Sequence, residues 1–455
     1  MLQEIVKHSS EIINDYFNAG DVEFEARISK FVQRESQKGL TGFHFLQGLV
    51  FGFIKNPQAS LNQLCQTLSD IGVDITAQGL DQRINPQAVA FLKQQLAQAL
   101  TVYQGKQREI SETLTSFTNV YFLDSTLIPL PDELKDVFPA FNTKGAEAAI
   151  KIQLLFDFLT GQVTQMAVTE GKSSDNAYQT HLPWLTAGSL LIQDLGYFRL
   201  DTLQTIAQQG AYFLTRWYMQ TAIYQSVTGE RIDLLSFLRQ QEESAGEYAI
   251  ELGVNQRIQC RMVYVKLPQE IVDQRRRKAK EKARKRGATP SKEQLALLAW
   301  NIFLTNAPVA MLSLRQILVC YSLRWQIELI FKLWKSGAAL KHLSGIRKER
   351  ILVELYAKMI GIVLFHFLFA PFRFLLHEQG VELSPVKGQQ ILKDRGKDIY
   401  LAMTHGLEHL EREILVLSQR ILRFAHKTKR KTRLSTYDKL SWADNLEICE
   451  LYPLA

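Results

Sequence analysis

The chain has 455 residues, of which 46% are hydrophobic and 22% are charged, a composition that is typical of globular proteins and excludes a disordered one. Its length predicts about two to four domains. The formal net charge of +8 favours a polyanionic partner. The four cysteines are scattered and form no CxxC pair, so we expect neither a zinc site nor a disulfide framework, and a reducing cytoplasm is the predicted location.

Residues 1–115 are predicted to be helical. The N-terminus is amphipathic and mixed in charge, unlike a signal peptide. Ser60 and Thr76 are suitable N-caps, and helices over 60–69 and 76–85 would form a helix-turn-helix. The candidate DNA contacts of that motif are Gln78, Gln82 and Arg83. A plain helical bundle explains the same pattern equally well.

An α/β core is predicted to begin near residue 116. Apolar runs that are typical of buried strands alternate with helical segments, in the order three strands, helix, strand, helix, strand. The predicted strands cover 120–123, 149–158, 162–168, 189–193 and 210–216, and the predicted helices cover 174–185 and 200–209. Thr160 and Gly161 predict a hairpin turn between the second and third strands. A last core strand is predicted over 300–306, and Ser313 is predicted to be the N-cap of the helix that follows it.

The core pattern is interrupted between residues 219 and 299. Strands predicted over 245–252 and 256–267 would form a separate small sheet. They precede the run 275–286, RRRKAKEKARKR, in which nine residues are Lys or Arg and one, Glu281, is acidic. A helix of this composition repels itself unless an anion neutralises it, so the run indicates an anion-binding segment, with a solvated linker as the alternative.

The stretch YSLRWQIELIFKLWK, residues 321–335, is predicted to be a single helix. At 3.6 residues per turn its polar side chains fall on one narrow face, and the remaining faces are apolar. These polar residues are Tyr321, Arg324, Glu328 and Lys335, with Lys332 beside them. Such a helix should be buried on most sides, with a polar ridge that faces a cleft holding a charged ligand. The alternative is a core helix whose polar stripe meets water.

Two aspartates, Asp124 and Asp194, each follow an apolar strand, and ligands of α/β sheets bind at the carboxyl ends of strands. Together with Glu328 they would form three carboxylates that repel one another strongly. Mg²⁺, which prefers oxygen ligands, relieves such repulsion, and two ions about 3.5–4 Å apart serve an in-line displacement at phosphorus. Asp201 is better explained as a helix N-terminal charge, and Asp157, between two Phe on a strand, is a weaker candidate.

The spacing Tyr-(2)-Arg-(3)-Glu-(6)-Lys in residues 321–335 resembles the signature of one branch of the bacterial insertion-sequence transposases, the DDE class. LTN lies just upstream at 304–306. Asp124 in LDST looks like that family's first catalytic Asp, and Asp194 in QDLGYF looks like its second. Leu195 departs from the family, in which a basic residue often follows the second Asp. The resemblance extends from about Val120 to the end of the signature and is weak at both ends of the chain.

This resemblance implies a ribonuclease H-like mixed sheet flanked by helices, with a mainly β insertion. It implies that Asp124, Asp194 and Glu328 are catalytic and bind two Mg²⁺ ions, for which Mn²⁺ can substitute. The DNA-binding residues expected from the signature and the basic run are Tyr321, Arg324, Lys332, Lys335, Arg275, Arg276 and Arg277. A second basic tract, at 423–433, would hold DNA in the same way, through its phosphates.

The implied activity is cut-and-paste transposition. Water hydrolyses one strand at the transposon end, and the freed 3′-hydroxyl attacks a phosphodiester on the opposite strand or in target DNA. Double-stranded DNA is therefore the expected partner, and the pairing of two ends implies a homodimer in the synaptic complex. Two other functions remain as alternatives: a catalytically inactive, transposase-derived DNA-binding protein, and a metal-dependent DNA nuclease.

The predicted fold class is α/β, with helical regions at both ends of the chain. The predicted parts are a helical DNA-binding region at 1–115, a ribonuclease H-like core at 116–218 and 300–380, a β-rich insertion at 219–299, and a helical region with a basic tract at 381–455. The most apolar run, 359–372, ends near Pro371 and is too short to span a bilayer, so we expect a core helix and no membrane contact. A bacterial, nucleoid-associated protein of the cytoplasm is expected.

Overall fold

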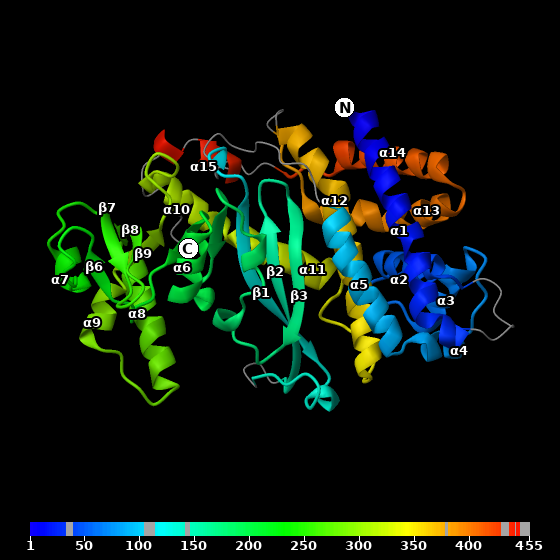
Figure 1. The fold of residues 1–455 in the computed structure, drawn as a ribbon, viewed down its shortest axis with the longest axis horizontal. Coiled ribbons are helices and arrows are strands. Elements are labelled where there is room, and N and C mark those ends of the chain that lie inside the picture. The colour runs from blue at the N-terminus through cyan, green and yellow to red at the C-terminus, as the bar shows by residue number, and fades with distance from the viewer. Residues whose placement is uncertain are drawn as a thin grey trace. The chain divides into compact units, whose positions relative to one another are not determined.

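The computed structural model describes residues 1–32, 40–103, 114–141, 146–377, 381–428, 436–441 and 443–445. The chain forms two compact units. The first consists of Met1–Arg108, Ser125–Ser173 and Ile327–Lys431, and the second of Glu109–Asp124, Ser174–Gln326 and Thr432–Ala455. Strand β1 (Val120–Leu130) and helix α11 (Trp325–Gly337) each begin in the second unit and continue in the first (Figure 1).

Nine strands form one mixed sheet in the order β3-β2-β1-β4-β5-β9-β8-β7-β6. Strands β1, β4 and β5 are parallel neighbours, whereas β9, β8, β7 and β6 continue the sheet in antiparallel pairs. The α/β class that we predicted, with helices at both ends of the chain, is therefore confirmed. The predicted separate small sheet is wrong, because β8 pairs with β9 along residues 261–266 and extends the core sheet.

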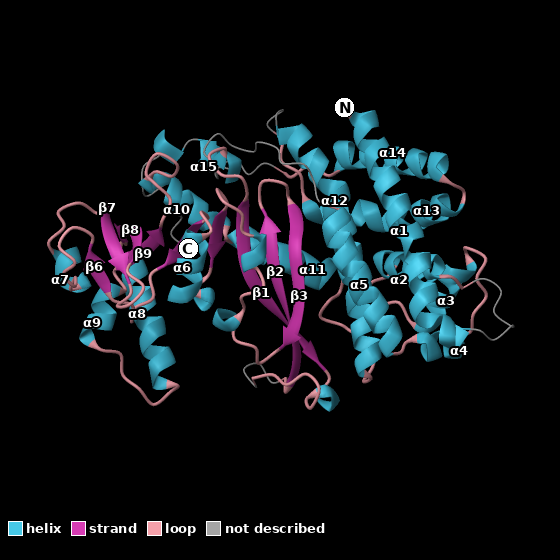
Figure 2. Cartoon of the chain, in the orientation of Figure 1, coloured by secondary structure: helices cyan, strands magenta, loops and turns pink. Residues whose placement is uncertain are grey.

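The first unit is mainly helical, and its two complete strands form the β2–β3 hairpin. Its elements are α1 (Leu2–Val32), α2 (Gly42–Lys55), α3 (Leu61–Ser69), α4 (Ala77–Arg83), α5 (Pro86–Val102), β2 (Ala148–Asp157), β3 (Gln162–Glu170), α12 (Lys348–His377), α13 (Pro385–Thr404) and α14 (Leu407–Phe424). Helices α5 and α12 pack against β3 (Figure 2). The predicted hairpin turn is confirmed by Gly161, whose φ of +71° is unfavourable for residues with a side chain.

Helices α3 and α4 confirm the two helices predicted near the N-terminus. The side chains of Ser60 and Thr76 accept the hydrogen bonds expected of N-caps. The α4 residue Asp81 forms an ion pair with Arg347 (3.2 Å), so this helix is attached to the segment that precedes α12. Arg83 donates to the Gly79 carbonyl oxygen of its own helix.

Helix α12 contains the apolar run that was predicted to be a core helix. It continues past Pro371 to His377 and is therefore longer than we predicted. Among the described residues, it is the helix whose length and composition would allow it to cross a membrane, but its apolar stretch is entirely buried inside the protein. This burial agrees with the predicted core helix.

The second unit carries most of the sheet. Its elements are β4 (Leu190–Gln193), α6 (Leu200–Gln208), β5 (Tyr212–Arg216), β6 (Ile223–Gln225), α7 (Leu234–Arg239), β7 (Ala245–Leu252), β8 (Ile258–Lys266), α8 (Gln269–Arg284), α9 (Lys292–Leu297), β9 (Trp300–Thr305), α10 (Leu314–Leu323) and α15 (Thr436–Ser441). The helix predicted over 174–185 is wrong. Two short 3₁₀ helices, Asp175–Ala177 and Leu182–Trp184, occupy this segment. Pro183 disfavours the α conformation at the residue before it, which works against a continuous α-helix over this segment.

Candidate active site

The two predicted catalytic aspartates lie at neighbouring positions of the sheet. Strands β1 and β4 pair in parallel, and the last residues in register are Leu123 and Gln193. Asp124 is the next residue of β1, and Asp194 directly follows the end of β4, so the two aspartates each come one residue after the same register pair. We predicted that the first strand would end before Asp124, whereas β1 continues to Leu130.

The side chain of Arg324 lies between these two carboxylates. Its Nη1 is 3.2 Å from Oδ2 of Asp124, and its Nε is 4.0 Å from Oδ1 of Asp194. The Arg324 and Asp124 side chains are each 18% exposed, and that of Asp194 is 45% exposed. The guanidinium therefore lowers the repulsion between two acids in a partly desolvated site.

Helix α10 brings Arg324 to this position. It begins at the N-cap Ser313, as predicted, and a capping box with Gln316 fixes its start. The single helix predicted over 321–335 is wrong, because α10 ends at Leu323 and α11 begins at Trp325. The backbone N–H of Arg324 donates to the Tyr321 carbonyl oxygen (3.2 Å), which closes a tighter turn than an α-helix and separates the two helices.

Tyr321 is mostly buried. Its side chain is 8% exposed, and its ring packs against Phe303 of β9 with centroids 4.9 Å apart. The preceding residue, Cys320, is fully buried, and burial raises the pKa of its thiol to about 12. That thiol therefore stays protonated at neutral pH, and a nucleophilic cysteine is excluded at this position.

The remaining signature residues lie on α11. Glu328 is half-buried in the first turn, Lys332 is exposed, and Lys335 is half-buried in the last turn. We predicted that this helix would be buried on its apolar faces, but Trp325 is 50% exposed and Leu329 is 43% exposed. The apolar pattern therefore overstated the burial of α11.

The three predicted carboxylates are divided between the two units. Asp124 and Asp194 belong to the second unit, and Glu328 belongs to the first. Within the part of the chain that the structure describes, no group of three or more His, Cys, Asp or Glu side chains is assembled for a metal ion. The part of the site that lies within one unit is therefore the aspartate pair with Arg324.

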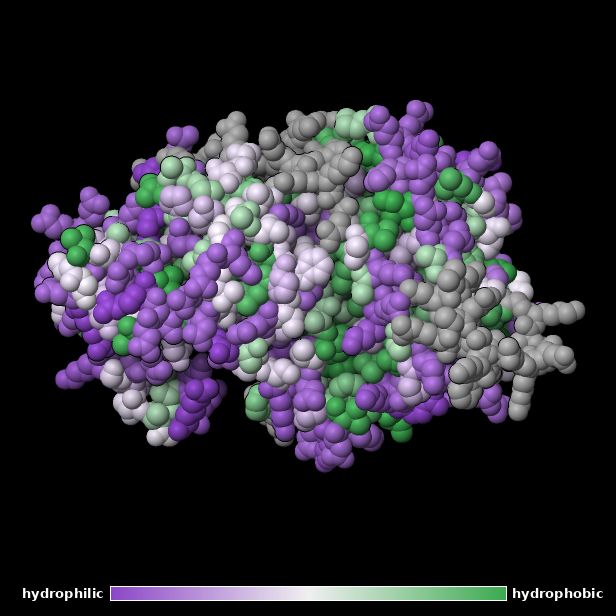
Figure 3. Space-filling model, viewed as in Figure 1, coloured by the Kyte–Doolittle hydropathy of each residue, from purple (hydrophilic) through white to green (hydrophobic). Residues whose placement is uncertain are grey.

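The basic run is part of helix α8, as its composition suggested. Arg275 donates to Asn301 of β9 (2.9 Å), and Arg276 donates to the Leu295 carbonyl oxygen (3.0 Å). These two arginines hold α8 to its surroundings. The sequence did not show which members of the run are exposed to solvent. In the structure the exposed cations are Arg277, Lys278, Lys280, Lys282, Arg284, Lys285 and Arg286. Helix α8 (Figure 1) lies in the part of the molecule where Figure 3 shows hydrophilic residues together with some neutral and hydrophobic ones.

The second basic tract, 423–433, lies partly outside the described residues, which continue here as far as Thr428. Within the described part, Lys427 pairs with Glu382 (2.7 Å). Lys427 of this tract is therefore already in an ion pair within the protein.

The two weaker aspartate candidates have structural contacts. Asp201 is in the first turn of α6 and pairs with Arg199 (3.3 Å), in the position that a helix N-terminal charge should occupy. Asp157 is buried and accepts a hydrogen bond from the Leu159 backbone N–H (3.0 Å). Each carboxylate is thus explained by its local role in the fold.

The aspartate pair suits a hard divalent cation. Carboxylate oxygens are the ligands that such ions prefer, and Mg²⁺ is commonly held through one or two protein carboxylates. The donor set of Asp124 and Asp194 therefore fits Mg²⁺ or Mn²⁺. A mixed α/β sheet with paired aspartates at one step of two parallel strands defines a candidate metal-dependent phosphoryl-transfer enzyme.

Comparison with known proteins identifies the family. Residues 115–364 match the family model described as "Transposase DDE domain". The chain belongs to this family, and it is a transposase, an enzyme of DNA cleavage and strand transfer. It therefore binds DNA and depends on divalent metal ions. This result favours transposition over the alternatives of an inactive DNA-binding protein or a simple nuclease.

Proteins similar to this chain include transposases of comparable length. The transposase for insertion sequence element IS231C of Bacillus thuringiensis subsp. berliner is 30% identical over 403 residues, which cover 83% of this chain and 84% of that one. The transposase for insertion sequence element IS1151 of Clostridium perfringens is 26% identical over 456 residues, 96% of each chain. The cryo-EM structure of a piggyBac transposase synaptic complex with hairpin DNA aligns with a TM-score of 0.45 and 11% identity, over 94% of this chain and 86% of that one.

Proposed function

We propose that this transposase binds the ends of a bacterial insertion sequence and moves the element by cut-and-paste transposition, with Asp124, Asp194 and Glu328 as its catalytic carboxylates. The observation that carries the proposal is the adjacency of Asp124 and Asp194 across β1 and β4, with Arg324 between them. Glu328 is assigned as the third carboxylate from the signature spacing and from its place in the first turn of α11.

The three carboxylates would hold two Mg²⁺ ions, for which Mn²⁺ can substitute. When bound, such ions activate the attacking oxygen of an in-line displacement and stabilise the leaving oxygen. Arg324, Lys332 and Lys335 are proposed to bind the phosphates of the transposon end, since guanidinium and ammonium groups are the usual partners of phosphate oxygens. Tyr321 is proposed to contribute through its hydroxyl and is not a nucleophile.

In the proposed reaction course, a water molecule attacks a phosphodiester at the end of the element, and the bond to the 3′ oxygen breaks. The freed 3′-hydroxyl then attacks a phosphodiester on the opposite strand or in target DNA, and a new bond to phosphorus replaces the one that breaks. The chain's own cations orient the phosphates through both steps. No covalent bond between protein and DNA is required.

The remaining parts of the chain have proposed roles in holding DNA. The exposed cations of α8 and the tract at 423–433 would neutralise phosphates, and the helices within residues 1–115 would recognise the sequence of the ends. The five parts predicted from sequence remain the proposed domain division. We further propose a homodimer in the synaptic complex and a location in the bacterial cytoplasm, with the nucleoid.

The substitution Glu328→Gln tests this proposal. We expect Mg²⁺-dependent cleavage of a duplex carrying the element's end to fall by about a hundredfold or more, because a metal-binding charge is lost, while DNA binding stays intact. The matched control is Glu349→Gln, which changes the first-turn glutamate of the next helix, α12. Cleavage retained by Glu328→Gln would remove Glu328 from the site.

A further inference from the structure

Arg324 has two sets of anionic partners that compete for its guanidinium. In the structure its guanidinium lies 3.2 Å from Asp124 and 4.0 Å from Asp194. In the proposed function the same side chain binds a DNA phosphate. A guanidinium that binds a phosphate directs its charge and its N–H donors toward that phosphate. The phosphate and the two carboxylates therefore compete for Arg324.

The same guanidinium also competes with a divalent ion. A metal ion on Asp124 or Asp194 would place two positive charges within a few ångströms of the Arg324 charge, in a site where Asp124 and Arg324 are each 18% exposed. Like charges repel strongly in such a partly desolvated place. Metal binding is therefore weakened while Arg324 remains on the carboxylates, and it is strengthened when Arg324 leaves.

We propose that Arg324 couples divalent-ion binding to DNA binding. In the DNA-free protein its guanidinium holds the two carboxylates. A phosphate of the transposon end draws it away, and the carboxylates, left without this counter-charge, bind the metal ion more tightly. The DNA complex therefore binds the metal ion more tightly than the DNA-free protein does. This inference rests on the proposed metal site of Asp124 and Asp194.

The proposed coupling is tested by measuring metal binding with and without DNA, because the two binding equilibria are linked. The factor by which DNA tightens metal binding must equal the factor by which the metal tightens DNA binding. Mn²⁺ binding to the full-length protein is measured by electron paramagnetic resonance, with and without a duplex that ends at the terminus of the element. The duplex carries a 2′,3′-dideoxy nucleotide at the 3′ end of the element. It therefore lacks the 3′-hydroxyl that would attack target DNA, and binding is measured without reaction.

For the unaltered protein, we expect the duplex to lower the Kd for Mn²⁺ by about tenfold or more. Arg324→Ala should bind Mn²⁺ more tightly than the unaltered protein without DNA, and the duplex should no longer change its Kd. Arg324→Lys keeps one charge but cannot reach both carboxylates with a planar fork, so its coupling should be intermediate. This variant also carries the test if Arg324→Ala does not fold.

Arg199→Ala is the matched control, because Arg199 also pairs with an aspartate, Asp201, in the same unit (3.3 Å). It should keep the coupling of the unaltered protein. The inference is overturned if Arg324→Ala binds Mn²⁺ with unchanged affinity in the absence of DNA, or if either Arg324 variant retains full coupling. Asp124→Asn distinguishes a failure of the coupling from a failure of the metal site. If this variant binds Mn²⁺ as tightly as the unaltered protein, or if no form of the protein binds Mn²⁺, the proposed metal site is overturned as well.

Discussion

Arg261 of β8 donates a 2.7 Å hydrogen bond to the carbonyl oxygen of Leu312, directly before the N-cap of α10. It also donates to the Ala307 carbonyl oxygen (2.9 Å) and pairs with Glu247 of β7 (2.6 Å). Its side chain is 13% exposed. Burial lowers the pKa of this guanidinium, and Glu247 raises it back in part. The inserted strands thus fix the loop from which α10 starts, and Arg324 directly follows the last residue of α10.

Removing the Arg261 guanidinium should destabilise the protein. Arg261→Met leaves two backbone carbonyls and Glu247 without their donor, so we expect the free energy of unfolding to fall by about 1–3 kcal/mol. Denaturant titration measures the change. A second expected effect is weaker coupling between DNA and Mn²⁺, since the start of α10 is no longer held.

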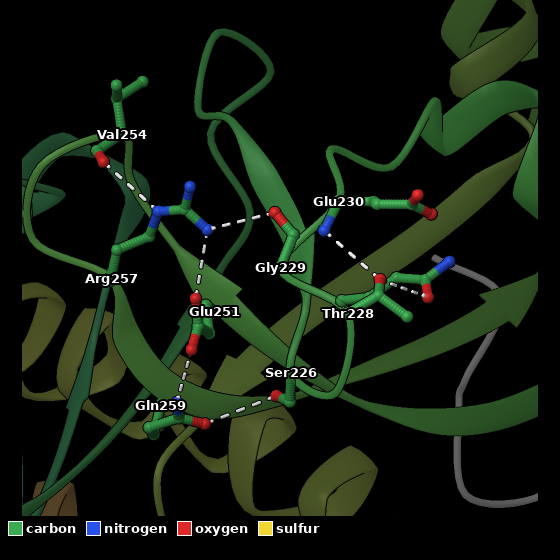
Figure 4. A network of polar contacts seen from close by, with 9 residues as sticks. Ser226, Thr228, Gly229, Glu230, Glu251, Val254, Arg257 and Gln259 are labelled. Carbon is green, nitrogen blue, oxygen red and sulfur yellow. Dashed lines mark hydrogen bonds and ion pairs between the residues drawn. The ribbon is translucent and has the colours of Figure 1, made fainter.

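Arg257→Met is the control for Arg261. Arg257 also bonds two carbonyl oxygens and a glutamate, Glu251, but its side chain is 38% exposed at the end of the inserted strands (Figure 4). We expect its loss to cost less than about 1 kcal/mol, because solvent screens the pair and can replace it. A cost equal to that of Arg261→Met would show that burial does not set the difference.

Local patterns predicted most of the secondary structure. The bounds predicted for β7 agree with the structure, and the N-caps Ser60, Thr76 and Ser313 were placed correctly. Each of these features depends on a few neighbouring residues. The break at Arg324 was missed, because residues 321–335 have a continuous helical period and a helix end without Gly or Pro leaves little trace in sequence.

The site was predictable as a set of residue types but not as a set of spatial neighbours. Asp124 and Asp194 could be identified from the apolar runs before them and from their motifs. Their pairing with Arg324 joins residues up to 200 positions apart, and no local period carries that information. In the same way, the basic run offered no means to separate Arg275, which bonds Asn301, from its exposed neighbours.

The exposed cations of α8 should account for the salt dependence of DNA binding. Changing Arg277, Lys278 and Lys280 to Gln should weaken binding and reduce the slope of log Kd against log salt by about 0.9 for each phosphate that the protein no longer neutralises. Thermal stability should stay unchanged, because the three side chains are exposed. Arg276→Gln is the comparison: it should lower the Tm, because its hydrogen bond to Leu295 is removed. An unchanged slope for the triple variant would make the run a linker.

Glu354 and Lys358 form a buried ion pair in α12, with Nζ 2.7 Å from Oε1 and both side chains 1% exposed. Lys358 also donates to the Ala339 carbonyl oxygen, and Glu354 accepts from the Ser344 N–H, so the pair anchors the loop that follows α11. Burial lowers the pKa of Lys358. Lys358→Met should lower the free energy of unfolding by about 3–5 kcal/mol, because it leaves a buried carboxylate uncompensated.

Two further variants check that explanation by chemical denaturation. Lys358→Met combined with Glu354→Leu should cost less than Lys358→Met alone, since no charge remains buried. Lys7→Met breaks the exposed pair of Lys7 with Glu11, also spaced four residues apart, and should change stability by less than about 0.5 kcal/mol. If the double variant is less stable than Lys358→Met alone, the loss of stability comes from altered packing and not from an unpaired buried charge.

The last prediction concerns His366, which is buried in α12 beneath α11. Its Nε2 accepts a hydrogen bond from the Trp334 indole (3.2 Å). Burial lowers the pKa of its imidazole to about 4, and the positive charge of Arg373 acts in the same direction. In the unfolded chain a histidine takes up its proton near pH 6.5. Between about pH 6.5 and pH 4 the unfolded state therefore binds more protons, and folded-state stability is lost as the pH falls through this window.

The size of that loss is about 3 kcal/mol, at about 1.4 kcal/mol for each pH unit between the two pKa values. His366→Gln removes the titrating group while its amide oxygen can still accept from Trp334. Its free energy of unfolding should therefore fall less between pH 7 and pH 4.5 than that of the unaltered protein. Burial also lowers the pKa of His181 to about 4, so part of the dependence of stability on pH should remain in this variant. His409→Gln, at an exposed position, should retain the full slope, and a full slope in His366→Gln would contradict the assignment.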